Sequence, residues 1–150
     1  MLDDITLSIR SDPRLLCAVR GLVRPYLEKH DVAAERIDGV VLAVDEACTN
    51  AIRHSYGRSS DREVWLSLRQ LPEFIEVEVR DDGAPAPADR VQRQPMARPD
   101  PETVVPGGLG IPLIYSAFDD VIFEPGAERG NRVRMRLRLN QAGETPCPSK

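Results

Sequence analysis

The sequence has few cysteines, and their spacing limits what they can do. Only three of the 150 residues are cysteine, and no two of them are spaced as CxxC. Three thiols in this arrangement make neither a disulfide framework nor a zinc site. We expect Cys17 and Cys48, which fall at apolar positions of predicted helices, to be small core residues, and Cys147 to be an exposed thiol.

The sequence also lacks a surplus of positive charge and any long apolar run. Its 20 lysines and arginines against 24 aspartates and glutamates give a formal net charge of −4, which argues against binding nucleic acid through the phosphates. No apolar run approaches the roughly 18 residues of a membrane span. Residues 1–11 carry acidic side chains where a signal peptide would carry basic ones. We therefore expect a cytoplasmic protein that contacts neither nucleic acid directly nor a membrane.

What is present is the pattern of an ordinary globular domain, with 41% hydrophobic and 29% charged residues. We expect one domain over residues 1–139, followed by a flexible tail over residues 140–150. Pro25 lies inside the apolar pattern of the first helix, which should therefore kink or end near Arg24. The expected strands are at about 2–10, 63–69, 74–81, 121–124 and 131–139, and the expected helices at about 13–27, 33–55 and 107–117.

This order of elements predicts an α+β fold, a two-layer sandwich in which helices cover one face of a mixed, mostly antiparallel sheet. Along the last strand, apolar residues alternate with four arginines at positions 132, 134, 136 and 138. Glu76 and Glu78 line the matching face of a neighbouring strand, and acid beside arginine would stabilise that face modestly. The face is either a solvated sheet back or, with Trp65, a partner-binding surface.

Residues 82–106 form the least regular part of the chain. They hold six of its 13 prolines and show no apolar periodicity. A loop of this length inside one domain is most often a lid or a binding loop, so we expect a lid here.

Three short segments carry residues suited to phosphate chemistry. Glu46, Asn50 and His54 are spaced i, i+4, i+8 and share one stripe of the second helix. An amide oxygen can bind Mg²⁺, and a carboxylate can accept a proton from an attacking hydroxyl or water. Taken alone, this spacing is also typical of a solvated helix surface.

The other two segments are Asp81-Asp82-Gly83 and the Gly107-Gly108-Leu109-Gly110 run. By its parity with the apolar residues before it, Asp81 should point to the core side of the sheet, where a carboxylate needs donors such as the amine of a purine. Gly83 would let the backbone approach a ligand closely, although a turn at the strand end explains the same residues. Backbone N–H groups of the glycine run at a helix start suit an anion, although a hinge looks the same.

Taken together, these segments resemble the N, G1 and G2 boxes of the GHKL (Bergerat-fold) ATPases in order and spacing. The form of the first segment, the single-domain length and the residues from Gly107 to Val121 look like the RsbW-like anti-sigma-factor serine/threonine kinases of bacterial partner switching. The resemblance covers residues 5–139. It implies the Bergerat ATP-binding fold, with ATP and Mg²⁺ as cofactors.

The resemblance also implies roles for single residues. Asn50 matches the Mg²⁺ ligand, Glu46 the catalytic base and Asp81 the acid that holds the adenine amine. Gly83 matches a glycine of the adenine pocket, and Asn131 stands where a threonine often supports the adenine site. Gly107, Gly108, Leu109 and Gly110 match the phosphate-binding lid region. Pro85 departs from the usual glycine, and residues 103–106 offer no lysine or arginine for the γ-phosphate.

The function that the resemblance implies is an ATP-dependent serine/threonine protein kinase that is also an anti-sigma factor. It would phosphorylate an anti-anti-sigma (STAS-domain) partner, sequester a sigma factor and form a homodimer. The alternative is a nucleotide-binding partner-switch module of the same fold without kinase activity, or with a target other than a sigma factor. Retention of Glu46 leans against a module that only binds. A sensor histidine kinase is disfavoured because residues 1–32 hold no phosphoacceptor histidine on a helical hairpin of its own.

Overall fold

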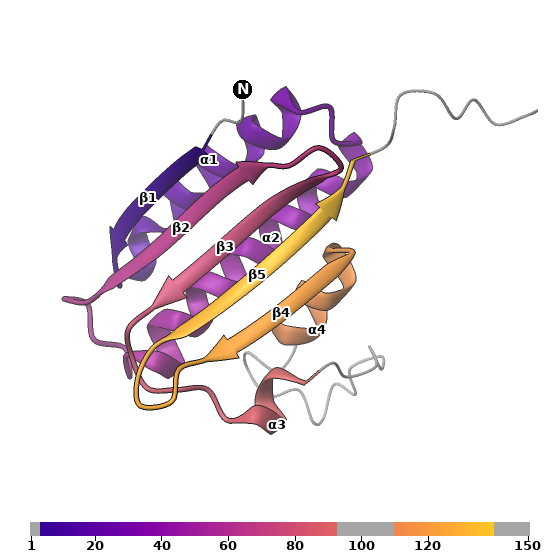
Figure 1. Cartoon of the computed structure of the whole chain (residues 1–150). Helices are drawn as coiled ribbons and strands as arrows, with labels where there is room; N and C mark the ends of the chain where they lie inside the picture. The colour runs from indigo at the N-terminus through magenta and orange to yellow at the C-terminus, as the bar shows by residue number, and fades with distance from the viewer. Residues whose placement is uncertain (1–3, 93–109, 140–150) are drawn as a thin grey trace, which may run out of the picture.

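The computed structural model describes residues 4–92 and 110–139. Figure 1 shows the arrangement of the elements. A 3₁₀ turn (Pro13–Leu15) precedes the first helix, and a π-helical turn (Ala51–Ser55) extends the second. The strands are β1 (Asp4–Arg10), β2 (Glu63–Gln70), β3 (Phe74–Asp81), β4 (Asp120–Pro125) and β5 (Asn131–Arg138), and the helices are α1 (Leu16–Lys29), α2 (Ala34–Asn50), α3 (Ala88–Val91) and α4 (Gly110–Ala117).

The five strands form one sheet in the order β1-β2-β3-β5-β4, with α1, α2 and α4 against one face (Figure 1). The two-layer α+β sandwich is therefore confirmed. The expectation of a mixed sheet is wrong for the described residues, because all four neighbouring pairs are antiparallel. The reason lies in the connections: β2–β3 and β4–β5 are hairpins, and β5 returns beside β3 in the opposite direction.

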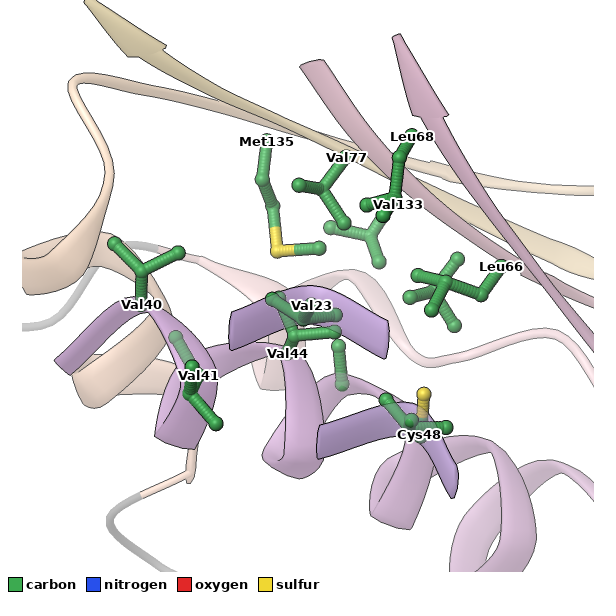
Figure 2. Packing of buried hydrophobic residues seen from close by; sticks show 14 of the residues in the cluster. Val23, Val40, Val41, Val44, Cys48, Leu66, Leu68, Val77, Val133 and Met135 are labelled. Carbon is green, nitrogen blue, oxygen red and sulfur yellow. The ribbon is translucent and has the colours of Figure 1, made fainter. Parts of the chain in front are cut away.

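The core lies between α1, α2 and the sheet. Figure 2 shows Val23, Val44 and Cys48 of the two helices facing Leu66 and Met135 of the sheet, and all five side chains are almost fully buried. Cys48 is thus a core residue, as expected. Cys17 is exposed, so the expectation for it is wrong.

The position of Cys17 follows from the stripe that α1 buries. That stripe consists of Leu16, Val19, Val23, Tyr26 and Leu27. Cys17 comes one residue after Leu16, and one residue turns a helix by about 100°. Its side chain therefore leaves the core face.

Pro25 does not end α1, which continues to Lys29. A proline in a helix interior costs about 3 kcal/mol. Tyr26 and Leu27 follow it and are buried, and burying such side chains contributes about 1.5–3 kcal/mol each. Packing of the last turn therefore outweighs the local cost of the proline.

The sheet face opposite the helices pairs its own charges. Arg136 Nε donates to Glu76 Oε2 at 2.8 Å, and Arg134 pairs with Glu124 across the β4–β5 hairpin. Arg132 lies 3.5 Å from Glu78. The expected pairing of acids with arginines is confirmed, and these three arginines are neutralised within the sheet.

No helix in residues 4–92 or 110–139 combines the length and the apolarity needed to cross a bilayer.

Candidate functional site

The end of α2 carries the first group of site residues. α2 ends at Asn50, and the chain continues as the π-helical turn Ala51–Ser55, so the predicted helix over 33–55 is nearly correct in extent but differs in its last turn. The amide of Tyr56 donates to the carbonyl of Ala51 at 3.1 Å, five residues back. Turns of this kind occur frequently at functional sites. Here the turn carries Ser55 to the end of β3.

Asp81 is the last residue of β3 and is only 6% exposed. Its Oδ2 accepts a hydrogen bond from the Ser55 hydroxyl at 2.8 Å. Its Oδ1 accepts from the amide of Gly83 at 2.9 Å and from Asn131 Nδ2 at 3.0 Å. The predicted orientation of Asp81 toward the helix side is therefore confirmed, and three donors offset the cost of burying the carboxylate.

Asn131 lies opposite Asp81 in the β3–β5 pairing and organises the segment that follows β3. Besides contacting Asp81, its Nδ2 lies 3.0 Å from Ser55 Oγ and 2.9 Å from the carbonyl oxygen of Ala84. Its Oδ1 accepts from the amide of Ala86 at 2.7 Å. One side chain therefore holds residues 84–86 against the end of the sheet.

Gly83 packs against the backbone of Ser55. A Cβ at position 83 would overlap the Ser55 carbonyl oxygen and lie 2.7 Å from the Ser55 Cβ. The amide of Ala84 donates to that same carbonyl at 2.9 Å. The structure thus explains the glycine by contact within the protein, whereas the sequence suggested close approach to a ligand.

Glu46 and Asn50 meet the first residue of α4. A Cβ on Gly110 would lie 2.7 Å from Glu46 Oε2 and 3.8 Å from Asn50 Oδ1, so the glycine leaves room for both side chains. Partial burial, followed by the negative charge of Asp45, raises the pKa of the Glu46 carboxyl above its ordinary value, and Arg53 opposes this shift. A raised pKa makes the carboxylate a better proton acceptor near neutral pH.

A cavity opens between the end of α2, the ends of β3 and β4, the start of β5, and α3. It contains about 520 Å³ of space free of protein atoms, part of it open to solvent. The apolar lining includes Ala47, Ala51, Val79, Ile111, Phe123 and Val133. The polar lining includes Asn50, His54, Ser55, Asp81, Arg90 and Asn131. An apolar pocket with a few converging polar groups is the usual form of a small-molecule site.

Only some of the predicted site residues line this cavity. Asn50, Asp81 and Asn131 line it. Glu46 lies one helical turn before Asn50, beside Gly110, and Gly83 lines a neighbouring polar hollow instead. Gly107, Gly108 and Leu109 lie outside the described residues, as do residues 93–106 of the expected lid. In the described part of that lid, residues 88–91 form α3, a short helix that the loop prediction missed.

The residues present fit a magnesium nucleotide. Within the described residues, Asn50 Nδ2 is buried without a hydrogen-bond partner, which leaves a donor for a ligand. The described residues contain no group of three or more His, Cys, Asp or Glu side chains that could hold a metal by themselves. Mg²⁺ is commonly held by one or two protein oxygens together with substrate phosphates and water, which Asn50 Oδ1 could join.

Two cavity residues were missed by the sequence reasoning. Ser55 had a usable signal, because it continues the buried stripe of Cys48 and Ala51 at helical spacing and is polar where that stripe is apolar. The sequence carries no such signal for Arg90, because its helix spans only four residues within an aperiodic segment. Its place in the cavity depends on contacts between distant parts of the chain.

Comparison with known proteins defines the class. A family model described as the histidine kinase-like ATPase domain matches residues 9–137, and the chain belongs to this family. Curated relatives include an anti-sigma F factor of Clostridium novyi, 30% identical over 122 residues that cover 80% of this chain and 83% of the relative. The anti-sigma F factor of Bacillus subtilis is 25% identical over 123 residues, covering 82% and 84%. The predicted resemblance to RsbW-like partner-switching kinases is thus confirmed.

A solved structure supports the fold. The chain resembles the crystal structure of the RsbU and RsbW domains of Rv1364c from Mycobacterium tuberculosis with a TM-score of 0.59 and 18% identity. The match covers 91% of this chain and 32% of that longer chain, so this protein spans about a third of it. The expected GHKL-type fold is confirmed.

Proposed function

We propose that the chain is an ATP-dependent serine/threonine protein kinase and anti-sigma factor. Its substrate would be an anti-anti-sigma protein with a STAS domain, and a sigma factor would be its second partner. The observation that carries the proposal is the placement of Glu46, with its raised pKa, beside Asn50 and Gly110, while Asn50 and Asp81 line the same cavity.

Asp81 would hold the adenine. A carboxylate whose donors are Ser55, Gly83 and Asn131 is fixed in place, and a carboxylate oxygen has further acceptor capacity for an exocyclic amine. The apolar part of the cavity lining suits the faces of a purine ring. Asn131 would take the part that a threonine often takes in related kinases.

Asn50 would hold Mg²⁺ and the phosphates, together with Gly107, Gly108, Leu109 and Gly110. Bound Mg-ATP supplies the transferable phosphoryl group and the positive charge that screens it. Glu46 would accept the proton of the substrate hydroxyl, for which a carboxylate of raised pKa is suited. Asn50 would orient the phosphate end toward Glu46.

The remaining expectations belong to the same proposal. Residues 1–139 would form the single ATPase domain, with residues 82–106 as its lid and 140–150 as a tail outside it. The protein would act in the cytoplasm as a homodimer, without contacting nucleic acid or a membrane directly. The anti-sigma F relatives support the sigma factor and anti-anti-sigma protein as partners.

The test is a phosphotransfer assay with labelled ATP, using STAS-domain proteins encoded in the same genome as substrates. Wild type should label serine or threonine of one of them. Removing a general base typically costs 10²–10⁴-fold, so Glu46→Gln should lose about 100-fold or more. Glu35→Gln, on the exposed first turn of the same helix, is the matched control and should keep full activity.

The alternative remains a partner-switch module that binds nucleotide without transferring phosphate. In that case wild type would bind Mg-ATP but label none of the partners. Glu46→Gln would then change neither nucleotide binding nor partner exchange.

A further inference from the structure

Two arginines line the cavity, and they differ in their partners. Arg132 lies 3.5 Å from Glu78 and 4.0 Å from Glu124, so its charge is matched within the sheet. Arg90 is half-buried and forms no ion pair with any carboxylate in residues 4–92 and 110–139. Burial lowers the pKa of the Arg90 guanidinium, and no acid raises it again. An arginine stays charged in proteins, so among the described residues Arg90 is a positive charge without an ion-pair partner.

The segment that carries Arg90 is held at both ends. Asn131 bonds to the carbonyl of Ala84 and the amide of Ala86 before α3. The Tyr115 hydroxyl of α4 donates to the carbonyl of Val91, next to Arg90, at 2.8 Å. These contacts from the sheet and from α4 hold α3 beside the cavity, and Arg90 therefore forms part of the cavity lining.

The cavity lining holds a second donor besides Arg90. Asn50 Nδ2 is a buried donor without a partner in the described residues. Neither described carboxylate of the lining pairs with Arg90, since Asp81 accepts from Ser55, Gly83 and Asn131, and Glu124 pairs with Arg134. Asn50 Nδ2 needs a hydrogen-bond acceptor and Arg90 needs a negative charge, and phosphate oxygens supply both.

We propose that Arg90 binds the phosphate chain of the nucleotide, a role for which residues 103–106 offer no lysine or arginine. The inference rests on the proposed function, because it assumes that the cavity holds a purine nucleotide. A guanidinium suits phosphate oxygens because it donates two parallel hydrogen bonds. Arg90 thereby sets the preference of the site for nucleotides over nucleosides.

The experiment compares dissociation constants for adenosine, AMP, ADP and ATP, measured by calorimetry with Mg²⁺ on the full chain. Charge-assisted hydrogen bonds contribute about 1.5–3 kcal/mol, so Arg90→Gln should weaken ATP binding by about 10- to 100-fold. The loss should shrink as phosphates are removed and vanish for adenosine. Arg90→Lys should recover part of the affinity, and Arg14→Gln, at a highly exposed remote position, should change nothing.

Two results would overturn the inference alone. If Arg90→Gln weakens adenosine as much as ATP, Arg90 contacts the base or supports the pocket, and if it weakens neither, it contacts no ligand. If wild type binds none of the four compounds, the proposed function falls and this inference falls with it. An unchanged melting temperature of the unliganded variant shows that the fold is intact.

Discussion

The hydroxyl of Ser55 donates a hydrogen bond to Asp81 Oδ2 at 2.8 Å and so ties the end of α2 to the end of β3, 26 residues further along the chain. The same hydroxyl oxygen lies 3.0 Å from Asn131 Nδ2 on β5. Three elements therefore meet at one serine. Asp81 is held in a single orientation because both of its oxygens have a donor.

Replacing Ser55 with alanine should cost stability and ligand affinity together. The change removes the donor to Asp81 Oδ2, and a lost hydrogen bond to a charged group costs about 1.5–3 kcal/mol. In a domain of this size each kcal/mol shifts the melting temperature by about 2–4 °C. Calorimetric melting and ATP titration measure both effects.

Ser67→Ala is the control for that variant. Ser67 also bonds to another side chain, Thr6 at 3.3 Å, but on the exposed face of the sheet. Its loss should stay within about 0.5 kcal/mol. Equal melting temperatures and equal ATP affinities for Ser55→Ala and Ser67→Ala would show that the Ser55–Asp81 contact has no role.

Two glycines should respond in opposite directions when changed to alanine. At position 83 a Cβ would overlap the Ser55 backbone, which cannot move freely, so Gly83→Ala should destabilise the protein by about 1–3 kcal/mol. At position 39, inside α2, a Cβ meets nothing within 4 Å. Gly39→Ala should stabilise by about 0.5–1 kcal/mol because alanine favours the helix. Thermal or urea unfolding measures both, and a stable Gly83→Ala protein would contradict the packing described here.

The pH dependence of phosphotransfer should report the raised pKa of Glu46. Only the deprotonated carboxylate can accept a proton, so the rate should rise as the pH rises through that pKa. Because the pKa of Glu46 is raised, this rise in rate occurs at higher pH than it would for an ordinary glutamate. The measurement is the single-turnover rate against pH.

Neighbouring charges provide the controls for this profile. Asp45 raises the pKa of Glu46, so Asp45→Asn should move the rise in rate to lower pH. Arg53 lowers the pKa of Glu46, so Arg53→Gln should move the rise in rate to higher pH. Comparing variants cancels the titration of the nucleotide itself. Shifts in the reverse directions would refute the assignment of Glu46 as the base.

Several features of the fold and site were predictable from the sequence because they depend on local periodicity. The two-residue period of β3 through Val77 and Val79 correctly placed Asp81 on the helix side. The 3.6-residue period of α2 correctly placed Cys48 in the core. Such patterns predict the structure correctly because the residues of each element determine which of its faces is buried.

Other features depend on contacts that no local pattern records. The helix α1 continues past Pro25 because Tyr26 and Leu27 pack into the core. The meeting of Ser55 with Asp81 needs a π-helical turn whose wider geometry the apolar stripe does not indicate. Arg90 reaches the cavity only because Asn131 and Tyr115 hold its segment there.

The most direct test of the account is the melting temperature with and without Mg-ATP, for wild type, Asp81→Asn and Asp82→Asn. A ligand at about 100 times its dissociation constant adds roughly 2.7 kcal/mol, a rise of about 5–10 °C here. Wild type should show this rise. Asp82 pairs with Arg62 and Arg129 instead of the Ser55–Asn131 group, so Asp82→Asn should keep the rise.

Asp81→Asn should lose the rise while still melting cooperatively without ligand, because the carboxylate that would receive the adenine amine is gone. That result would establish the cavity as a nucleotide site with Asp81 at its base. If millimolar Mg-ATP leaves the melting temperature of wild type unchanged, or if Asp81→Asn is stabilised as much as wild type, the central claim is wrong.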